Sequence, residues 1–169
     1  MTLHIRAATP ADAPALMALH GASWRAAYGP YVPPGALGTP LDANMRARWD
    51  RWPADRMIRL AERDGAVVGF GAVEWGNVPL LDNLHVSPDA RGGGVGGRLF
   101  RAICADVATQ GATALRLFVI EPHAGARRFY RRMGGVEGAA VDDMLLGAPV
   151  RMVPVLFEGA VFAALRQEL

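Results

Sequence analysis

The chain has 169 residues, of which 51% are hydrophobic and 20% are charged, and its formal net charge is +2. This composition is typical of an ordinary globular protein and excludes a disordered or collagen-like chain. No segment approaches the roughly 20 apolar residues of a membrane-spanning helix, and the first residues lack the pattern of a signal peptide. We therefore expect a single domain over residues 1–169, no membrane association and a cytoplasmic location.

All 18 basic residues are arginines, which excludes chemistry that depends on lysine. Neither a Schiff-base lysine nor the lysine of a phosphate-binding P-loop is available. The arginines are spread along the chain and the net charge is small, so we predict no nucleic-acid partner. Cys104 is the single cysteine and is expected to be a buried helix residue, and the four histidines lack the spacing of metal ligands, so we predict no metal.

The first half of the chain alternates between strand and helix patterns. Alternating residues predict strands, and apolar residues at helical spacing predict helices that begin after a capping residue and end before proline. We expect a strand at 3–8, a helix after Asp12, a helix near 41–52, and a hairpin of strands 57–62 and 66–75 joined by an Asp64-Gly65 turn.

The second half repeats strand and helix patterns around a cluster of glycines. We expect strands at 80–86 and 114–120, a helix from the glycines to Gly111, and a short helix within 123–135 that ends at Gly134. A closing hairpin is expected over 136–157 and a last helical turn or two in 159–169.

Residues 89–100 read DARGGGVGGRLF, with five glycines in six positions. Gly92, Gly94 and Gly97 fit the G-x-G-x-x-G pattern of dinucleotide-binding folds. However, residues 87–91 separate them from the preceding strand, and no acidic residue follows about 20 positions later to hold a ribose. The sequence does not fit a P-loop either, because no Lys-Ser/Thr pair follows the last glycine. Free amides at a helix N-terminus remain, and these favour a phosphate or pyrophosphate.

Two motifs resemble those of the GNAT superfamily of N-acetyltransferases. R-G-G-G-V-G-G-R-L places Arg91, Gly94 and Gly96 in that family's acyl-CoA signature, and A-R-R-F-Y-R-R-M-G at 126–134 is similar to its second motif. The resemblance covers most of the chain, including the opening I-R-A-A-T-P-A-D. It implies an α+β GNAT fold, in which about four helices flank a central, mostly antiparallel twisted sheet of about six or seven strands.

The resemblance also implies acetyl-CoA as co-substrate. The pyrophosphate of coenzyme A would rest on the amides of Arg91 to Gly96, and the pantetheine arm would lie along the strand at 84–86. His123 stands where the family commonly has an asparagine that binds this arm, and Gly135 where an aromatic residue usually follows. The implied cofactor-binding residues are Leu84, His85, Val86, Arg91, Gly92, Gly93, Gly94, Val95, Gly96, Gly97, His123 and Tyr130.

The implied catalytic residues are one tyrosine and a carboxylate. Tyr130 matches the family's general acid, which protonates the departing thiolate, although its ring could instead only pack in the core. Glu74 and Asp82 are alternative general bases, with His85 as a third alternative. Strand alternation predicts that Asp82 lies on the opposite face of its strand from His85.

The leading hypothesis is an N-acetyltransferase that acts on a primary amine of a small molecule or a protein. The alternatives are a catalytically degenerate acyl-CoA-binding sensor or interaction module and a nucleotide-dependent oxidoreductase, and a homodimer is compatible with each. The acceptor pocket is expected from residues 23–55 and the closing hairpin. Its walls would be aromatic, with Trp24, Tyr28, Tyr31, Trp49, Trp52 and Trp75 available for them.

Overall fold

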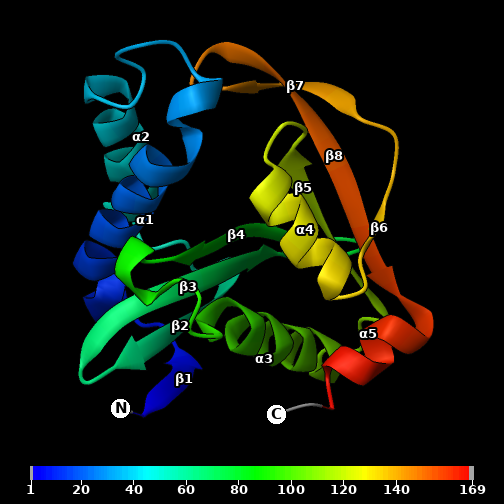
Figure 1. The fold of residues 1–169 in the computed structure, drawn as a ribbon. Coiled ribbons are helices and arrows are strands. Elements are labelled where there is room, and N and C mark those ends of the chain that lie inside the picture. The colour runs from blue at the N-terminus through cyan, green and yellow to red at the C-terminus, as the bar shows by residue number, and fades with distance from the viewer. Residues whose placement is uncertain (1, 168–169) are drawn as a thin grey trace.

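The computed structural model describes residues 2–167, and a continuous twisted sheet runs through it (Figure 1). The strands follow the order β1-β2-β3-β4-β5-β8-β6, and β7 pairs with β8. Their bounds are β1 Leu3–Ala7, β2 Arg56–Arg63, β3 Ala66–Glu74, β4 Leu80–Val86, β5 Ala114–Ile120, β6 Val136–Glu137, β7 Val141–Leu145 and β8 Ala148–Glu158.

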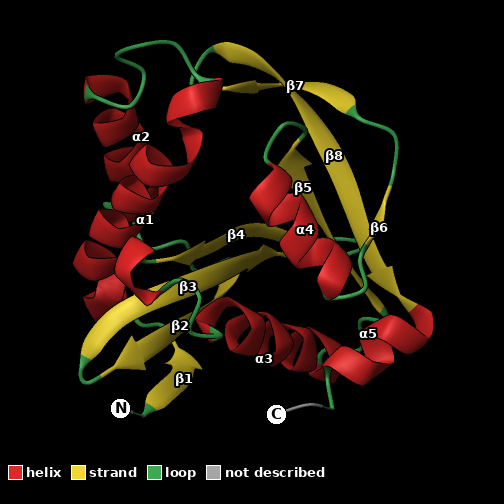
Figure 2. Ribbon diagram, viewed as in Figure 1, coloured by secondary structure: helices red, strands yellow, loops and turns green. Residues whose placement is uncertain are grey.

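Helices cover both faces of the sheet (Figure 2). Their bounds are α1 Ala13–Tyr28, α2 Thr39–Trp49, α3 Val95–Thr109, α4 Ala124–Arg132 and α5 Gly159–Leu165. The helices α1 and α2 enclose one apolar core with β2 and β3, whose buried members include Leu16, Met45 and Phe70. On the other face α3, α4 and α5 share a second core with β5 and β8, built around Phe100 and Phe157.

The strands β4 and β5 are parallel, whereas the other paired strands of the sheet are antiparallel. Among the described residues they pair only at Leu80 and Arg116, where both strands begin. Towards their carboxyl ends the two strands therefore separate, and the sheet opens on the side of the glycine cluster (Figure 1).

The structure confirms the predicted fold class and most of the predicted elements, with eight strands and five α-helices among the described residues. The strands predicted at 80–86 and 114–120 coincide with β4 and β5. Asp64 and Gly65 have positive φ values of 51° and 79°, as a tight hairpin turn between twisted strands requires. The two-residue strand β6 has no sequence signal, because it is too short to show alternation. Residues 168–169 of the predicted last helix lie outside the described residues.

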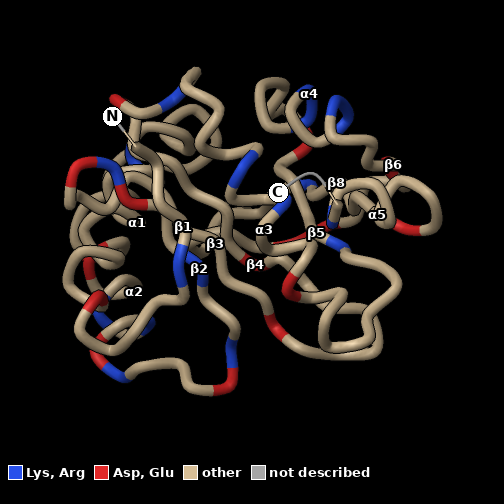
Figure 3. Tube along the Cα trace, turned by 90° about the horizontal axis from the view of Figure 1, so that it is seen from below, with Lys and Arg blue, Asp and Glu red and all other residues tan. Residues whose placement is uncertain are grey.

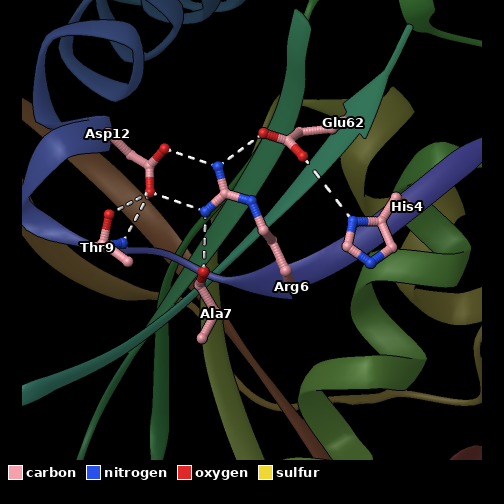
Figure 4. Close-up of polar contacts among 6 residues, drawn as sticks. All are labelled: His4, Arg6, Ala7, Thr9, Asp12 and Glu62. Carbon is pink, nitrogen blue, oxygen red and sulfur yellow. Dashed lines mark hydrogen bonds and ion pairs between the residues drawn. The ribbon is translucent and has the colours of Figure 1, made fainter. Parts of the chain in front are cut away.

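A charged cluster attaches the first strand to its neighbours (Figure 4). The Arg6 guanidinium donates to both oxygens of Asp12, at 2.9 and 2.8 Å, and to Glu62 of β2 at 2.7 Å. The Asp12 carboxylate also accepts from the amide of Thr9, which closes the turn that leads into α1. The ion pairs hold the pKa of Asp12 well below its usual range.

Acidic and basic residues are interspersed along the trace in Figure 3, and α4 carries a basic stretch, AGARRFYRR. Among the described helices, none combines the length and the apolar character needed to cross a membrane.

Candidate active site

A cavity of about 620 Å³ occupies the opening between β4 and β5. Leu84, His85 and Val86 line it from β4, and residues 117–120 line it from β5. The end of α1 covers it with Tyr28, and α4 covers it with Tyr130. The cavity therefore brings together the predicted pantetheine strand and the predicted general acid, which are far apart in the sequence.

The glycine cluster forms the turn between β4 and α3, as predicted. Gly92 and Gly94 have φ values of 78° and 74°, and Gly94 is the residue before α3 begins at Val95. The first amides of a helix have no carbonyl one turn earlier, so those of α3 are available to a ligand. These amides, Gly92 and Gly97 line a further hollow of about 460 Å³, together with Arg91, Arg101 and Arg132.

Shared lining residues join this hollow to the cavity between β4 and β5. Val86, Arg91, Gly96 and Phe129 line both. The Arg91 guanidinium folds back to the carbonyl of Val86, with an Nε–O distance of 3.3 Å. An extended ligand can thus run from the helix N-terminus to Tyr130 without leaving the surface.

Tyr130 both packs in the core and faces the cavity. Its ring contacts Phe129, Phe100 and Phe157, with centroid separations of 5.0, 5.9 and 6.4 Å. Burial, with a smaller contribution from Tyr28, raises the pKa of the Tyr130 phenol above its usual value. The hydroxyl therefore stays protonated at neutral pH, as a general acid must be before it acts.

The strand β4 contains a bulge that sequence alternation did not predict. Ala72 pairs with Asn83, but the next residue of β3, Val73, pairs with Leu81, so Asp82 is the extra residue. As a result Asp82 turns towards α2, the same side as Asn83 and His85, and its carboxylate accepts from Arg48 at 3.2 Å. The prediction that Asp82 lies opposite His85 is therefore wrong, because it assumed a regular strand.

The two candidate bases differ in their surroundings. Asp82 lines the cavity between the strands, and it accepts from Arg48, from Arg56 at 2.9 Å and from Asn83 at 2.6 Å. Glu74 is paired with Arg56 at the end of β3 and does not line that cavity. The structure therefore brings Asp82, but not Glu74, together with Tyr130.

His85 belongs to a buried polar row that runs beneath α1. Its Nδ1 lies 2.9 Å from Oγ of Ser23, and its ring centroid lies 4.7 Å from that of His20. The indole of Trp49 donates to Nδ1 of His20 at 3.2 Å. Burial lowers the pKa of His85 to about 3 and that of His20 to about 2, so both rings are neutral at pH 7.

His123 caps α4 and faces the cavity. Its Nδ1 accepts from the amide of Ala126 at 3.3 Å, so the neutral ring carries its proton on Nε2. Burial and the nearby Arg91 lower the pKa of His123 and so favour this neutral form. The Nε2–H group can donate a hydrogen bond, as the amide of an asparagine would.

The structure also explains Gly135. A Cβ at this position would lie 2.5 Å from Cγ1 of Val155 and 2.6 Å from Cζ of Phe157. The ring of Phe157 on β8 therefore occupies the space beside Gly135, and any side chain there would displace it.

Two residues that line or support the cavity were not singled out as site residues from the sequence. Ser23 of α1 lines the cavity, and Arg48 of α2 pairs with Asp82. Of the six aromatic residues considered for the acceptor pocket, Tyr28 and Tyr31 line the cavity, whereas Trp24 and Trp49 are buried in the core and Trp75 is exposed. No local motif marks these positions, because they approach β4 only after the helices pack.

Comparison with known proteins agrees with the fold and the motifs. The family model described as "Acetyltransferase (GNAT) family" matches residues 20–135, more than half of the chain. The uncharacterized N-acetyltransferase YhfO of Bacillus subtilis (strain 168) is 28% identical over 117 residues, which cover 65% of this chain and 77% of that protein. A histidine N-acetyltransferase of Xenopus tropicalis is 42% identical over 60 residues, but these cover only 32% of this chain and 18% of that protein.

Among solved structures, the PaiA N-acetyltransferase of Thermoplasma acidophilum, in complex with coenzyme A, superposes with a TM-score of 0.72 at 18% identity. The superposition covers 90% of this chain and 98% of that one. At this identity the likeness concerns the fold alone. With the family match over residues 20–135, the chain belongs to the acetyltransferase (GNAT) family.

Proposed function

We propose that this protein transfers an acetyl group from acetyl-CoA to a primary amine. The observation that carries the proposal is the surface that runs continuously from the amides of the glycine turn to Tyr130, through Arg91 and Gly96. Acetyl-CoA has a charged pyrophosphate at one end of its pantetheine arm and a reactive thioester at the other, and this surface has the matching order of groups. The complex of the PaiA enzyme with coenzyme A supports the same choice of ligand.

The binding groups follow from the chemistry of each part of the ligand. The free amides at the start of α3 suit the pyrophosphate, because the helix dipole and unpaired N–H groups both favour negative charge there. In the described part of the chain, the edge of β4 that faces β5 has no strand partner beyond Leu80, so its backbone groups suit the amides of the pantetheine arm. His123 adds a donor through Nε2.

The reaction needs a neutral amine, a stabilised oxyanion and a proton for the thiolate. The amine nitrogen attacks the thioester carbonyl, and the C–S bond breaks as the C–N bond forms. Tyr130 gives its phenolic proton to the departing thiolate, and Asp82 accepts the proton that the nitrogen loses, directly or through water. Asp82 is preferred to Glu74 because only Asp82 shares the cavity with Tyr130. A backbone amide of residues 84–86 supplies the oxyanion donor.

The test is thiol release from acetyl-CoA with a panel of primary amines, for the wild-type chain and Tyr130→Phe. Loss of a general acid lowers such rates by about 100-fold or more, so kcat of the variant should fall by that factor. Its thermal stabilisation by acetyl-CoA should stay close to wild type, since the ring is kept.

An unchanged rate in Tyr130→Phe would contradict the role of this phenol. Stabilisation of the wild type by acetyl-CoA without thiol release for any amine would instead support an acyl-CoA sensor. No stabilisation by acetyl-CoA or coenzyme A would contradict the proposal as a whole.

A further inference from the structure

A second cavity, of about 630 Å³, lies beneath the C-terminal end of α2. We call it the α2 cavity. Its floor is formed by Ile58 of β2, Ala72 of β3 and Asn83 of β4, and its rim by the segment from α2 to β2. Ion pairs connect it to the cavity between β4 and β5, because Arg48 and Arg56 line the α2 cavity and their partner Asp82 lines the other.

The lining of the α2 cavity holds more arginines than carboxylates. It contains Arg48, Arg51 and Arg56 but a single carboxylate, Asp55. Arg48 and Arg56 are engaged by Asp82, and Arg56 also pairs with Glu74. Arg51 is exposed and makes no ion pair with any residue in the described range 2–167. It is therefore the cation in this lining that is available to an anionic ligand group.

The same cavity has an aromatic wall. Trp52 is half-buried and contacts Trp49, with ring centroids 6.4 Å apart. Trp49 is fixed by its hydrogen bond to His20 and by the core around Phe70, so the wall is rigid. A flat or branched apolar group can pack against these rings while an attached charged group reaches Arg51.

The position of the α2 cavity relative to Asp82 suits an amine acceptor. Among the described residues, the lining of the α2 cavity does not overlap with that of the hollow at the glycine turn, so a ligand held there does not compete with the long donor ligand. Asp82, the proposed base, is paired with two residues of the cavity lining, Arg48 and Arg56. An amine held in the cavity therefore lies near the group that would take its proton.

From these contacts we infer that the α2 cavity binds the acceptor and selects an amine that carries a carboxylate and an apolar side chain, as an amino acid does. The carboxylate pairs with Arg51, the apolar group packs on Trp52, and the amine faces the Asp82 bulge. This inference rests on the proposed function for its catalytic meaning, but binding at the cavity can be measured separately.

The first experiment measures binding by calorimetry in the presence of saturating coenzyme A. Phenylalanine is compared with phenethylamine, and leucine with isopentylamine, because the members of each pair differ only in the carboxylate. A charge-assisted pair with arginine is expected to make the amino acid bind about 10-fold more tightly than its partner amine. Lack of a preference in both pairs would overturn the inference.

Two matched variants locate the carboxylate. Arg51→Gln should remove the preference, with less than about twofold effect on the plain amine, since only the charge-assisted contact is lost. Arg46→Gln makes the same charge change on α2 but outside the cavity lining, and it should keep the preference. A preference that survives Arg51→Gln would overturn the assignment.

Thiol release then separates the two proposals. If amino acids bind with the expected preference and acetyl-CoA binds, but no thiol is released, the binding site stands and the proposed acetyl transfer fails. In the opposite case, thiol is released from acetyl-CoA at the same rate with both members of each pair, and Arg51→Gln leaves that rate unchanged. Acetyl transfer then stands, and the α2 cavity is not its acceptor site.

Discussion

The glycine turn follows the carboxyl end of β4, whereas the α2 cavity lies against its middle residue, Asn83, and the chain builds the two regions differently. The glycine turn is made from consecutive residues, Arg91 to Gly97, and the proposed binding groups are its backbone amides. The α2 cavity is made from side chains of α2, β2, β3 and β4, and its charges are held by ion pairs between distant residues.

This difference has consequences for how each region responds to change. A site formed by backbone amides depends on the φ and ψ angles and on open space beside the backbone. It is therefore sensitive to added side chains and insensitive to pH. A site made from packed side chains depends on neutral histidines, paired carboxylates and the position of α1. Perturbations of charge should therefore affect the α2 side of β4 far more than the glycine turn.

The largest expected effect is the pH dependence conferred by the buried histidines. The pKa values of His20 and His85 are lowered from about 6.5 to about 2 and about 3, so below pH 6.5 the unfolded chain binds protons that the folded chain does not. The stability that these neutral rings contribute is complete above pH 6.5 and is lost as pH falls towards the folded pKa values. Each ring should contribute about 1.4 kcal/mol per pH unit to the loss.

Urea unfolding at pH 7, 6 and 5 measures this slope. His20→Gln should reduce the slope by about 1.4 kcal/mol per pH unit, because the contribution of that ring is removed. His4→Gln is the control, since His4 is on the surface with its side chain 67% exposed, and it should leave the slope close to wild type. A flat wild-type profile between pH 6 and 5 would contradict the assignment of two buried neutral rings.

A smaller effect should distinguish the two carboxylates that pair with Arg56. Asp82→Asn should lower kcat/KM by about 10-fold or more, because the variant cannot accept the proton of the amine. Glu74→Gln loses an ion pair with the same arginine but lies outside the cavity, so its kcat/KM should stay within about twofold of wild type. Initial rates of thiol release at saturating acetyl-CoA give both values. Equal losses in the two variants would show that the arginine cluster, rather than a base, matters for the rate.

The same contrast explains what the sequence could predict. The strands β4 and β5, the hairpin turn at Asp64 and the helix after the glycines depend on residues that are neighbours in the chain, and each was placed correctly. The role of Tyr130 as a cavity residue followed from its motif, which is also local.

The remaining contacts depend on long-range packing. The pair of Ser23 and His85 spans 62 positions, and that of Arg48 and Asp82 spans 34. The bulge that turns Asp82 towards α2 arises from the register between β3 and β4, which alternation within one strand does not determine. Hence the strands, helices and glycine turn could be predicted from the sequence, whereas the contacts around Asp82 could not.

The smallest expected effect separates two glycines of the turn. Gly94 has a φ of 74°, so Gly94→Ala should lower the free energy of unfolding by about 1 kcal/mol. Gly96 lies in the first turn of α3, and a Cβ there would meet Val86 and Phe129 at 3.6 and 3.7 Å, which is ordinary contact. Gly96→Ala should therefore leave stability unchanged or raise it by a few tenths of a kcal/mol, since alanine favours helix over glycine.

For acetyl-CoA binding, Gly96→Ala should have a larger effect than Gly94→Ala. The methyl group of Gly96→Ala would lie on the surface that the cavity between β4 and β5 shares with the hollow at the glycine turn. It should therefore weaken acetyl-CoA binding even though the fold is intact. Thermal unfolding of the free variants and calorimetry with acetyl-CoA measure the two properties separately. If Gly96→Ala binds as tightly as wild type, the ligand does not approach the backbone at this position. If it binds more weakly without loss of stability, the two glycines have different tasks: Gly94 permits the turn, and Gly96 leaves room for the ligand.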